Sequence, residues 1–314
     1  MDIKSLSDRL KANICKVITG KDEVIEKIII AALCSGHVLL EDIPGTGKTT
    51  AAKALAKSID CEFKRVQFTP DLLPSDVTGI NFYDRSDNTF KFRKGAVFTN
   101  ILLADEINRA APRTQSGLLE CMEERQATVD GKMYPLPSPF MVIATQNPIE
   151  TQGTFPLPEA QLDRFLMRLS MGYPSRENEL SLMEGHAVSS PLDTLGSVAS
   201  AEELSAAQQE VRSVRVSDAV RGYILDICTA TRNDRNIRLG VSPRGTLALF
   251  HAAQAQAAVN GRDFVTPDDV KQIAPDVIAH RIIPKTSAAL RDGVSAAQKE
   301  TAARITESIA VPIE

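Results

Sequence analysis

Tryptophan is absent from this 314-residue sequence, and aromatic residues of all kinds make up only 5% of it. The chain therefore offers no evident row of rings on which nucleic-acid bases would stack. Its net charge of −4 also lacks the basic excess that is typical of nucleic-acid-binding proteins. The longest apolar run, Ile28–Cys34, is far too short to cross a bilayer. We expect no bound nucleic acid and no membrane span.

Cysteine is also scarce. The five cysteines are widely separated along the chain, and no two of them form a CxxC pair. This spacing argues against a zinc site and is typical of reduced, buried thiols. The first ten residues include acidic side chains and no apolar core segment, which is unlike a signal peptide. We therefore expect a cytoplasmic protein.

One glycine-rich stretch, Glu41–Thr50, organises the first half of the chain. It follows the apolar run His37–Leu40, which reads as a buried strand, and it leads into the helix-forming segment Ala51–Ser58. A turn of this kind binds phosphate, because its N–H groups and the helix dipole favour negative charge. Gly45 and Gly47 would let the backbone come close to the ligand.

Two side chains of this turn complete a phosphate site. Lys48 would reach the β- and γ-phosphates of a nucleotide, and the Thr49 hydroxyl would ligate Mg²⁺. The stretch departs from the general phosphate-loop pattern at Asp42, where that pattern has glycine. The alternative is an ordinary glycine-rich turn with a solvated lysine.

A second group of polar residues follows two further apolar strands. The run Ile101–Ala104 predicts a strand buried on both faces, and it ends at Asp105 and Glu106. Ligands of α/β proteins bind outside the carboxyl ends of such strands. Asp105 would hold Mg²⁺ through water, and Glu106 would polarise the attacking water. Asn147, which follows the predicted strand 140–145, would orient that water. Each of these residues could instead belong to a solvated turn.

The pattern of apolar residues divides the chain near residue 174. Residues 1–174 predict an α/β core with two hairpins, one within 69–98 and one at Asp130-Gly131. Residues 175–314 predict a helical domain with an internal loop near 189–200. Helices are expected to begin at Ser217, at Ser242-Pro243 and at Thr266-Pro267.

Several long strings resemble the MoxR-type AAA+ ATPases from about residue 15 to the end. They are PGTGKT, LLADEINRA, VDGKMYPLPSPF, VIATQNPIE and LPEAQLDRFLMR. The resemblance implies an α/β fold: a parallel-sheet AAA+ P-loop core with hairpin insertions in helix 2 and before sensor 1, then a small all-helical lid domain. It also implies ATP and Mg²⁺ as cofactors.

The resemblance assigns a role to each candidate residue. Asn147 matches sensor 1, Arg164 matches an arginine finger that acts on a neighbouring subunit, and Arg244 matches sensor 2, in its own subunit or the neighbour's. Arg168 is the alternative finger, and an ion pair with Asp163 is the alternative role of Arg164. The residues expected to bind ATP are Gly20, Pro44, Gly45, Thr46, Gly47, Lys48, Thr49 and Thr50. Those expected to bind the metal are Thr49 and Asp105.

The function implied by the resemblance is Mg²⁺-dependent ATP hydrolysis in a homo-oligomeric ring, a hexamer by analogy. Such a ring would remodel or mature partner proteins, among them proteins with von Willebrand factor A domains. Two alternatives stay open: a nucleic-acid-dependent motor and a nucleotide-switched scaffold. Mixed charges on the first hairpin argue against the motor, and Glu106 argues against a scaffold, which has no need of a residue that polarises water.

Overall fold

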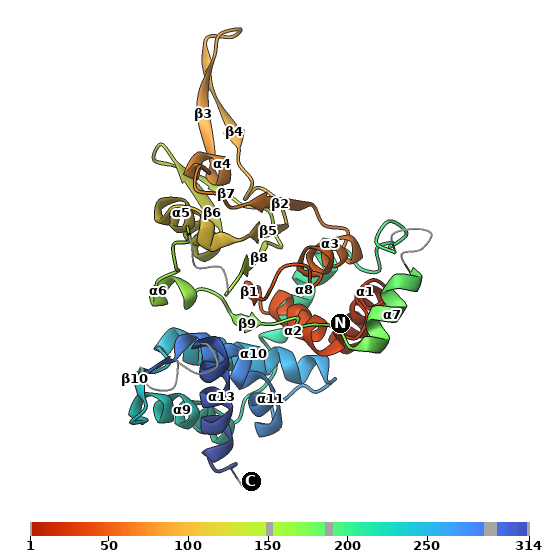
Figure 1. Cartoon of the computed structure of the whole chain (residues 1–314), viewed down its shortest axis with the longest axis vertical. Helices are drawn as coiled ribbons and strands as arrows, with labels where there is room; N and C mark the ends of the chain where they lie inside the picture. Colours follow the sequence, from red (N-terminus) through yellow and green to blue (C-terminus); the bar gives the residue numbers. More distant parts are fainter. Residues whose placement is uncertain (1, 149–152, 186–190, 286–293, 313–314) are drawn as a thin grey trace.

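A parallel five-stranded sheet forms the centre of the first half of the chain, in the order β2-β5-β8-β1-β9 (Figure 1). The computed structural model describes residues 2–148, 153–185, 191–285 and 294–312. The five strands are β1 (Val38–Glu41), β2 (Phe63–Gln67), β5 (Ile101–Asp105), β8 (Met141–Gln146) and β9 (Met167–Leu169). Strands β1, β5 and β8 occur where the sequence predicts them.

Apolar side chains alternate between the two faces of this sheet. Leu40, Leu103 and Ile143 belong to the core under one face, whereas Leu102 and Val142 belong to the core under the other. Both faces are therefore covered, as continuous apolar runs in parallel strands predict. The first face carries α1 (Ile3–Ile14), α2 (Asp22–Leu33) and α3 (Lys48–Ser58), and the second carries α5 (Pro112–Glu124).

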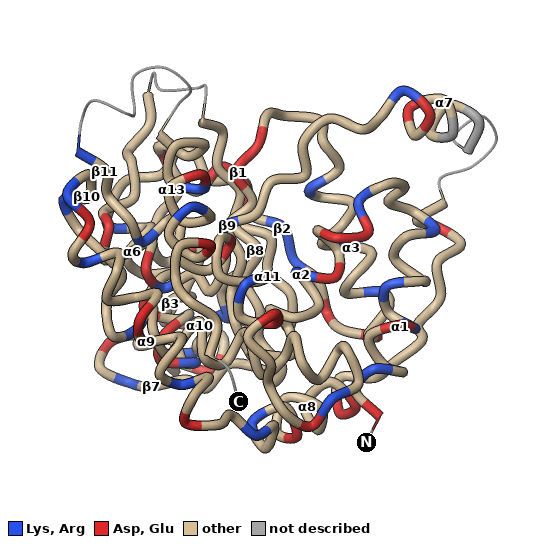
Figure 2. Tube along the Cα trace, turned by 90° about the horizontal axis from the view of Figure 1, so that it is seen from below, with Lys and Arg blue, Asp and Glu red and all other residues tan. Residues whose placement is uncertain are grey.

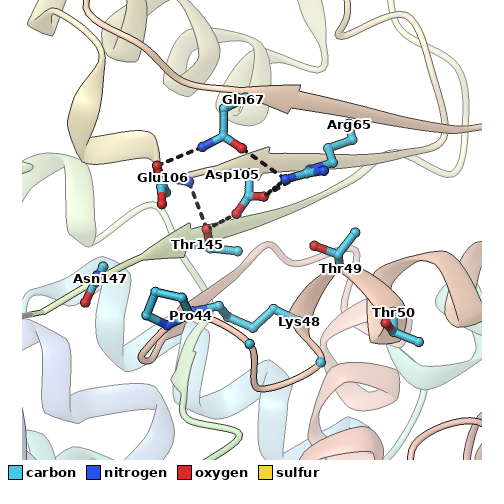
Figure 3. A pocket seen from close by; sticks show the side chains of 12 residues that line it. Pro44, Lys48, Thr49, Thr50, Arg65, Gln67, Asp105, Glu106, Thr145 and Asn147 are labelled. Carbon is cyan, nitrogen blue, oxygen red and sulfur yellow. Dashed lines mark hydrogen bonds and ion pairs between the residues drawn. The ribbon is translucent and has the colours of Figure 1, made fainter.

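The carboxyl ends of β1, β5 and β8 lie together. Their register pairs Glu41 with Gln146 and Ala104 with Ala144 across parallel strands. The segments that follow these strands therefore emerge at the same edge of the sheet (Figure 3).

Two antiparallel hairpins extend from the α/β core, as predicted. Asp130 and Gly131 form the turn of the second hairpin with φ of 49° and 75°, the positive values that a two-residue turn requires. The first hairpin projects well beyond the rest of the molecule, at the top of Figure 1. The hairpins are β3 (Gly79–Asp84) with β4 (Thr89–Lys94), and β6 (Gln126–Val129) with β7 (Lys132–Pro135); the short helix α4 (Pro74–Thr78) precedes the first.

The second half of the chain forms a helical lid. Ser217, Ser242 and Thr266 cap its helices with side-chain oxygens that accept N–H groups three residues ahead, which confirms the three predicted helix starts. Its elements are α9 (Asp218–Asn233), β10 (Ile237–Leu239), α10 (Pro243–Val259), α11 (Pro267–Ile278), η2 (Ala279–Arg281), β11 (Ile283–Pro284) and α13 (Val294–Ser308).

A small antiparallel ribbon, β10 with β11, was not predicted for this lid, which the sequence reads as all-helical. The strands have only three and two residues, and Ile237 alone is buried among them. Such short segments carry no alternating pattern, because long-range pairing rather than local sequence defines them.

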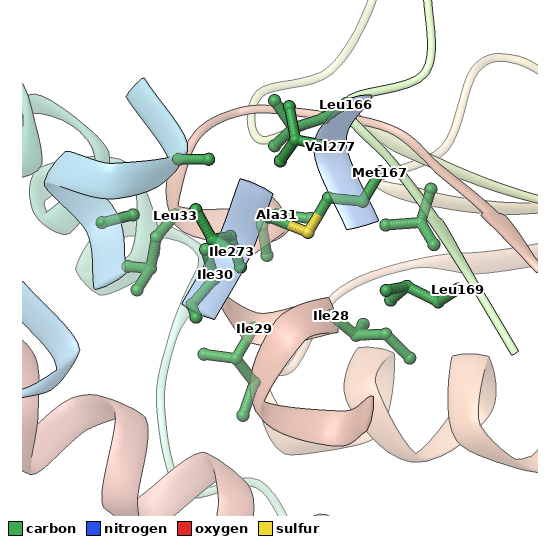
Figure 4. Close-up of a cluster of buried hydrophobic side chains, with 14 of the residues drawn as sticks. Ile28, Ile29, Ile30, Ala31, Leu33, Leu166, Met167, Leu169, Ile273 and Val277 are labelled. Carbon is green, nitrogen blue, oxygen red and sulfur yellow. The ribbon is translucent and has the colours of Figure 1, made fainter. Parts of the chain in front are cut away.

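The lid packs directly on the α/β core. Ile273 and Val277 of α11 lie against Ala31 of α2 and Met167 of β9, within one continuous apolar cluster (Figure 4). A buried ion pair reinforces this contact: the Asp276 carboxylate lies 2.6 Å from the Lys27 ammonium of α2. A cluster of this extent stabilises one arrangement of lid and core.

Two helices, α7 (Arg176–Gly185) and α8 (Ala201–Val211), connect core and lid. Gln208 of α8 donates to the Ala32 carbonyl of α2 at 2.7 Å, so α8 packs on the core side. The expected loop 189–200 falls partly outside the described residues, and its part from 191 on consists of turns and bends. The domain boundary near residue 174 stays a prediction.

Basic and acidic residues are interspersed along the chain in Figure 2. On the first hairpin Lys91 pairs with Asp84 at 2.7 Å and with Asp87. None of the described helices combines the length and the apolar character that crossing a membrane requires.

Candidate active site

The glycine-rich turn between β1 and α3 borders a cavity of about 380 Å³. Gly45 and Gly47 adopt φ of 85° and 88°, a left-handed conformation that favours glycine. A Cβ built on Gly45 would meet no atom within 4 Å, so the space beside the turn is open. Pro44, Thr49 and Thr50 line the same cavity, and the turn thus forms an open cradle at a helix N-terminus.

Lys48 lies on the floor of this cradle. Its ammonium donates to the carbonyls of Asp42 at 2.7 Å and Ile43 at 3.0 Å. Burial lowers the pKa of Lys48, while the carboxylates of Asp42, Asp105 and Glu106 act in the opposite direction. The cation therefore stays among carbonyls and carboxylates, next to the space where a phosphate would lie.

Asp42, the residue that departs from the phosphate-loop pattern, has a structural role. Its buried carboxylate accepts the N–H groups of Met171 and Gly172, the latter at 3.0 Å, and the Ser170 hydroxyl at 3.3 Å. These contacts tie the start of the turn to the chain that follows β9. Glycine has no side chain with which to make them.

The Asp105 carboxylate is held from two sides at the end of β5. Its Oδ1 accepts the Thr145 hydroxyl at 2.6 Å. Its Oδ2 accepts two N–H groups of Arg65, from Nε at 3.0 Å and from Nη2 at 2.7 Å. Asp105 faces Lys48 and Thr49 across the cavity in Figure 3.

Glu106 follows in a left-handed backbone conformation, with φ of 56°. Its N–H donates to the Thr145 hydroxyl at 2.8 Å. Its Oε2 accepts the Gln67 amide at 2.8 Å and lies 3.0 Å from Arg109 Nε. The strained backbone and these contacts fix the carboxylate at the rim of the cavity.

The structure thus brings together residues from three strand ends. Lys48, Thr49, Asp105, Glu106 and Asn147 all line one cavity, as expected from the sequence. Three further lining residues were missed by the sequence analysis: Arg65, Gln67 and Thr145. Alternation along β2 places the first two on one face, but only the register with β5 shows that this face meets Asp105.

These residues fit Mg²⁺ and a nucleotide. Magnesium in proteins is held by one or two carboxylates, a hydroxyl and the substrate's own phosphates, and it retains several waters. Thr49 and Asp105 offer such a partial ligand set beside the open cradle. Within the described part of the chain no three His, Cys, Asp or Glu residues form an all-protein metal site.

Known proteins resemble this chain over most of its length. The ATPase family associated with various cellular activities (AAA) matches residues 37–167, and the AAA lid domain matches residues 229–305. The chain is 40% identical over 306 residues to the chaperone MoxR1 of Mycobacterium tuberculosis. The match covers 95% of this chain and 80% of that protein. The chain belongs to the MoxR family of AAA+ ATPases.

Two other proteins are similar to this chain along nearly their whole length. The uncharacterized protein YeaC of Bacillus subtilis is 47% identical over 313 residues, which span 100% of this chain and 97% of that protein. A crystal structure of a protein from Cytophaga hutchinsonii, assigned as an ATPase, superposes with a TM-score of 0.88 at 36% identity, over 99% of this chain and 96% of that one. The AAA+ core and the helical lid are confirmed by these matches.

In this MoxR-family chain, two of the expected functional arginines, Arg164 and Arg244, lie away from the cavity of the glycine-rich turn. Arg164 donates to the Leu119 carbonyl at 2.6 Å, and Arg244 bonds the Glu123 carboxylate at 2.7 Å. Leu119 and Glu123 are one turn apart on α5, so the two arginines dock side by side on one helix. Neither lines the cavity of the glycine-rich turn.

Asp163 does form an ion pair, but its partner is Arg281 and not the adjacent Arg164 considered from the sequence. Arg281 of the lid bonds the Asp163 carboxylate at 2.6 Å and is almost fully buried. This pair closes the lid onto the segment before β9. It leaves Arg164 beside the backbone of α5.

Arg168 occupies a buried position between core and lid. It bonds Gln298 at 2.8 Å and Ser295 at 3.1 Å on α13, and it lies 3.4 Å from the Glu41 carboxylate. Its side chain is only 10% exposed. An arginine held in this way cannot reach a neighbouring subunit without breaking the lid contact.

Gly20 and Thr46 are both expected from the sequence to bind ATP, but neither lines the cavity of the glycine-rich turn. Gly20 has a φ of 71°, and a Cβ there would clash with Asn178 of α7 at 1.8 Å. The segment before α2 thus passes directly under α7. The Thr46 hydroxyl donates to the Ile43 carbonyl at 3.4 Å within the glycine-rich turn.

Proposed function

We propose that this chain hydrolyses ATP to ADP and phosphate with Mg²⁺ as cofactor. The observation that supports it most is the convergence of Lys48, Asp105 and Glu106 on one open cradle. When bound, Mg²⁺ would supply positive charge against the negative charge that develops on the phosphates during transfer. Lys48 would lie against the phosphates, and Thr49 with Asp105 would hold the metal.

Glu106 is our candidate for the residue that polarises the attacking water. It lies on the side of the cavity opposite the glycine-rich turn, and Gln67 and Arg109 hold its carboxylate (Figure 3). Asn147 lies at the same rim and would orient that water. A scaffold that only switches with nucleotide would not need a carboxylate positioned in this way.

We further propose that the ring, a hexamer by family resemblance, is the active form. Arg164 comes from the core and Arg244 from the lid, yet both dock on consecutive turns of α5 outside their own cavity. This placement supports a joint role at the nucleotide of the neighbouring subunit, Arg164 as finger and Arg244 as sensor 2. The burial of Arg168 supports the same choice between the two finger candidates.

The hairpins are our candidate client surface, and the client is a protein. Phe82, Tyr83 and Phe90 of the first hairpin and Met133 of the second are exposed apolar side chains. Tyr134 instead stacks on a phenylalanine of the first hairpin at 3.8 Å and joins the hairpins to each other. A partner with a von Willebrand factor A domain is proposed by family resemblance alone, and a cytoplasmic location from the five free thiols.

The runner-up, a nucleic-acid motor, is disfavoured by charge on the same surface. The Lys91 ammonium is paired with Asp84 and Asp87, and Asp130 at the tip of the second hairpin accepts the Asn81 amide at 2.8 Å. A phosphate backbone needs several unpaired cations in a row.

The test is a side-by-side ATPase titration with DNA, RNA and a partner captured on the chain in ATP. We expect stimulation by the protein partner and none by nucleic acid at physiological salt, and Phe90→Ser should weaken the former. Arg85→Ala, on the same hairpin, is the matched control and should leave it unchanged. Several-fold activation by nucleic acid alone, with steep salt dependence, would replace the protein-remodelling proposal with the motor.

A further inference from the structure

Arg65 lies beside the carboxylate that is expected to hold magnesium. It belongs to β2, the edge strand next to β5, and its partner across the ladder is Leu103. The guanidinium therefore points to the same face as Asp105, two residues further along β5. Although its side chain is 47% exposed, it lines the cavity together with Lys48.

The guanidinium is held in place from a second side. Arg65 Nη2 also donates to the Gln67 Oε1 at 3.0 Å, and the Gln67 amide in turn donates to Glu106 at 2.8 Å. An exposed arginine usually samples many rotamers, so an isolated surface ion pair contributes little. The added bond to Gln67 restricts the Arg65 side chain, so the Arg65–Asp105 pair has a better-defined geometry than an isolated surface ion pair.

Counting the acceptor sites of Asp105 shows what this geometry excludes. A carboxylate oxygen accepts about two hydrogen bonds. Oδ2 of Asp105 already accepts two N–H groups from Arg65, whereas Oδ1 accepts the Thr145 hydroxyl and keeps one acceptor site. A magnesium-bound water that donated to Oδ2 would have to take the place of at least one Arg65 N–H.

We propose that Arg65 is a positioning residue that competes with magnesium for Asp105 and so sets the metal concentration at which nucleotide binds. This inference rests on the proposed Mg²⁺-dependent function of the same site. Arg65 holds the Asp105 carboxylate oriented, and it gives up Oδ2 when a metal-bound water takes that oxygen. Its positive charge also opposes the metal directly, while it favours the phosphates of a metal-free nucleotide.

The test is binding of a fluorescent ADP analogue, followed by anisotropy, in EDTA and over a series of Mg²⁺ concentrations. We expect Arg65→Ala to lower the half-maximal Mg²⁺ concentration about three- to fivefold, the scale of one partly exposed ion pair. The same variant should bind the analogue more weakly in EDTA. Lys64→Ala is the matched control, because Lys64 donates to the Phe98 carbonyl away from the cavity and should change neither value.

Arg65→Lys separates hydrogen bonding from charge, since lysine keeps the charge but lacks the two-donor fork. We expect a half-maximal Mg²⁺ concentration between those of the parent and Arg65→Ala. A half-maximal Mg²⁺ concentration equal to the parent's would mean that only the charge of Arg65 matters, and it would overturn the competition for Oδ2. If Arg65→Ala loses its far-UV circular dichroism, Arg65→Lys alone decides.

The proposed Mg²⁺-dependent function and the proposed role of Arg65 would be contradicted by different results. Parent protein whose nucleotide binding does not depend on Mg²⁺ would contradict the proposed function. Parent protein that does depend on Mg²⁺, with an identical dependence in Arg65→Ala, would overturn the role of Arg65 and leave the proposed function standing.

Discussion

Replacing Asp42 by glycine, which restores the general phosphate-loop pattern, should destabilise this protein. Asp42 is 7% exposed, and its carboxylate accepts two backbone N–H groups, from Met171 and Gly172. A hydrogen bond to a charged group contributes about 1.5–3 kcal/mol, and glycine adds an unfolded-state cost of about 0.5–1 kcal/mol. Because water would hydrate part of the freed N–H groups, we expect a loss of about 3 kcal/mol in the free energy of unfolding.

The assay is urea unfolding followed by far-UV circular dichroism, with Asp42→Asn as the graded variant. Asparagine keeps one acceptor oxygen but not the charge, so it should lose about half as much. Asp60→Gly is the matched control, because Asp60 is exposed and already adopts a positive φ of 52° that suits glycine. An Asp42→Gly variant as stable as the parent would refute the idea that this carboxylate ties the turn to the end of β9.

Two further outcomes follow from other parts of the structure. His37 accepts the Val142 N–H on Nδ1 and donates to the Met122 carbonyl from Nε2, and burial lowers its pKa to about 3, so the folded state holds it neutral. Acidification from its ordinary pKa toward 3 should therefore reduce the urea midpoint. His37→Gln should make that dependence shallower without removing it, because burial also lowers the pKa of His280, and the ion-paired carboxyls of Asp234 and Asp269 have lowered pKa values as well. For the ring, Arg164→Ala and Lys48→Ala should each be nearly inactive, and mixing them should restore part of the turnover at interfaces that combine an intact finger with an intact cradle. Absence of recovery, with turnover independent of protein concentration, would place the whole site within one subunit.

Much of the candidate site could be predicted because its residues follow strand ends. The run Ile101–Ala104 is fully buried, as predicted, and it delivers Asp105 to the edge where β1 and β8 also end. Parallel strands share this edge whatever their order in the sheet. Local sequence was therefore enough to gather the glycine-rich turn, the acidic pair and Asn147 at one place.

The contacts that surround these residues could not be predicted in the same way. Arg65 and Gln67 read as ordinary polar positions of a strand, and their meeting with Asp105 depends on the β2–β5 register. The ion pair of Asp163 with Arg281 joins segments far apart in the chain. From the local sequence, the adjacent Arg164 was the candidate partner of Asp163. Tertiary packing instead brings Arg281 to Asp163.

The most direct test of the central claim is to measure ATP binding and ATP turnover on Glu106→Gln. Glu62→Gln is the control, because Glu62 is exposed and lies at the opposite end of strands β2 and β5, next to Ile101. The amide preserves the size of the side chain but cannot polarise water. We expect unchanged ATP affinity in both variants, and a loss of turnover of about 10²-fold or more in Glu106→Gln alone, the scale of losing a positioned base. Parental turnover in Glu106→Gln would contradict the assignment of this cavity as the hydrolytic site.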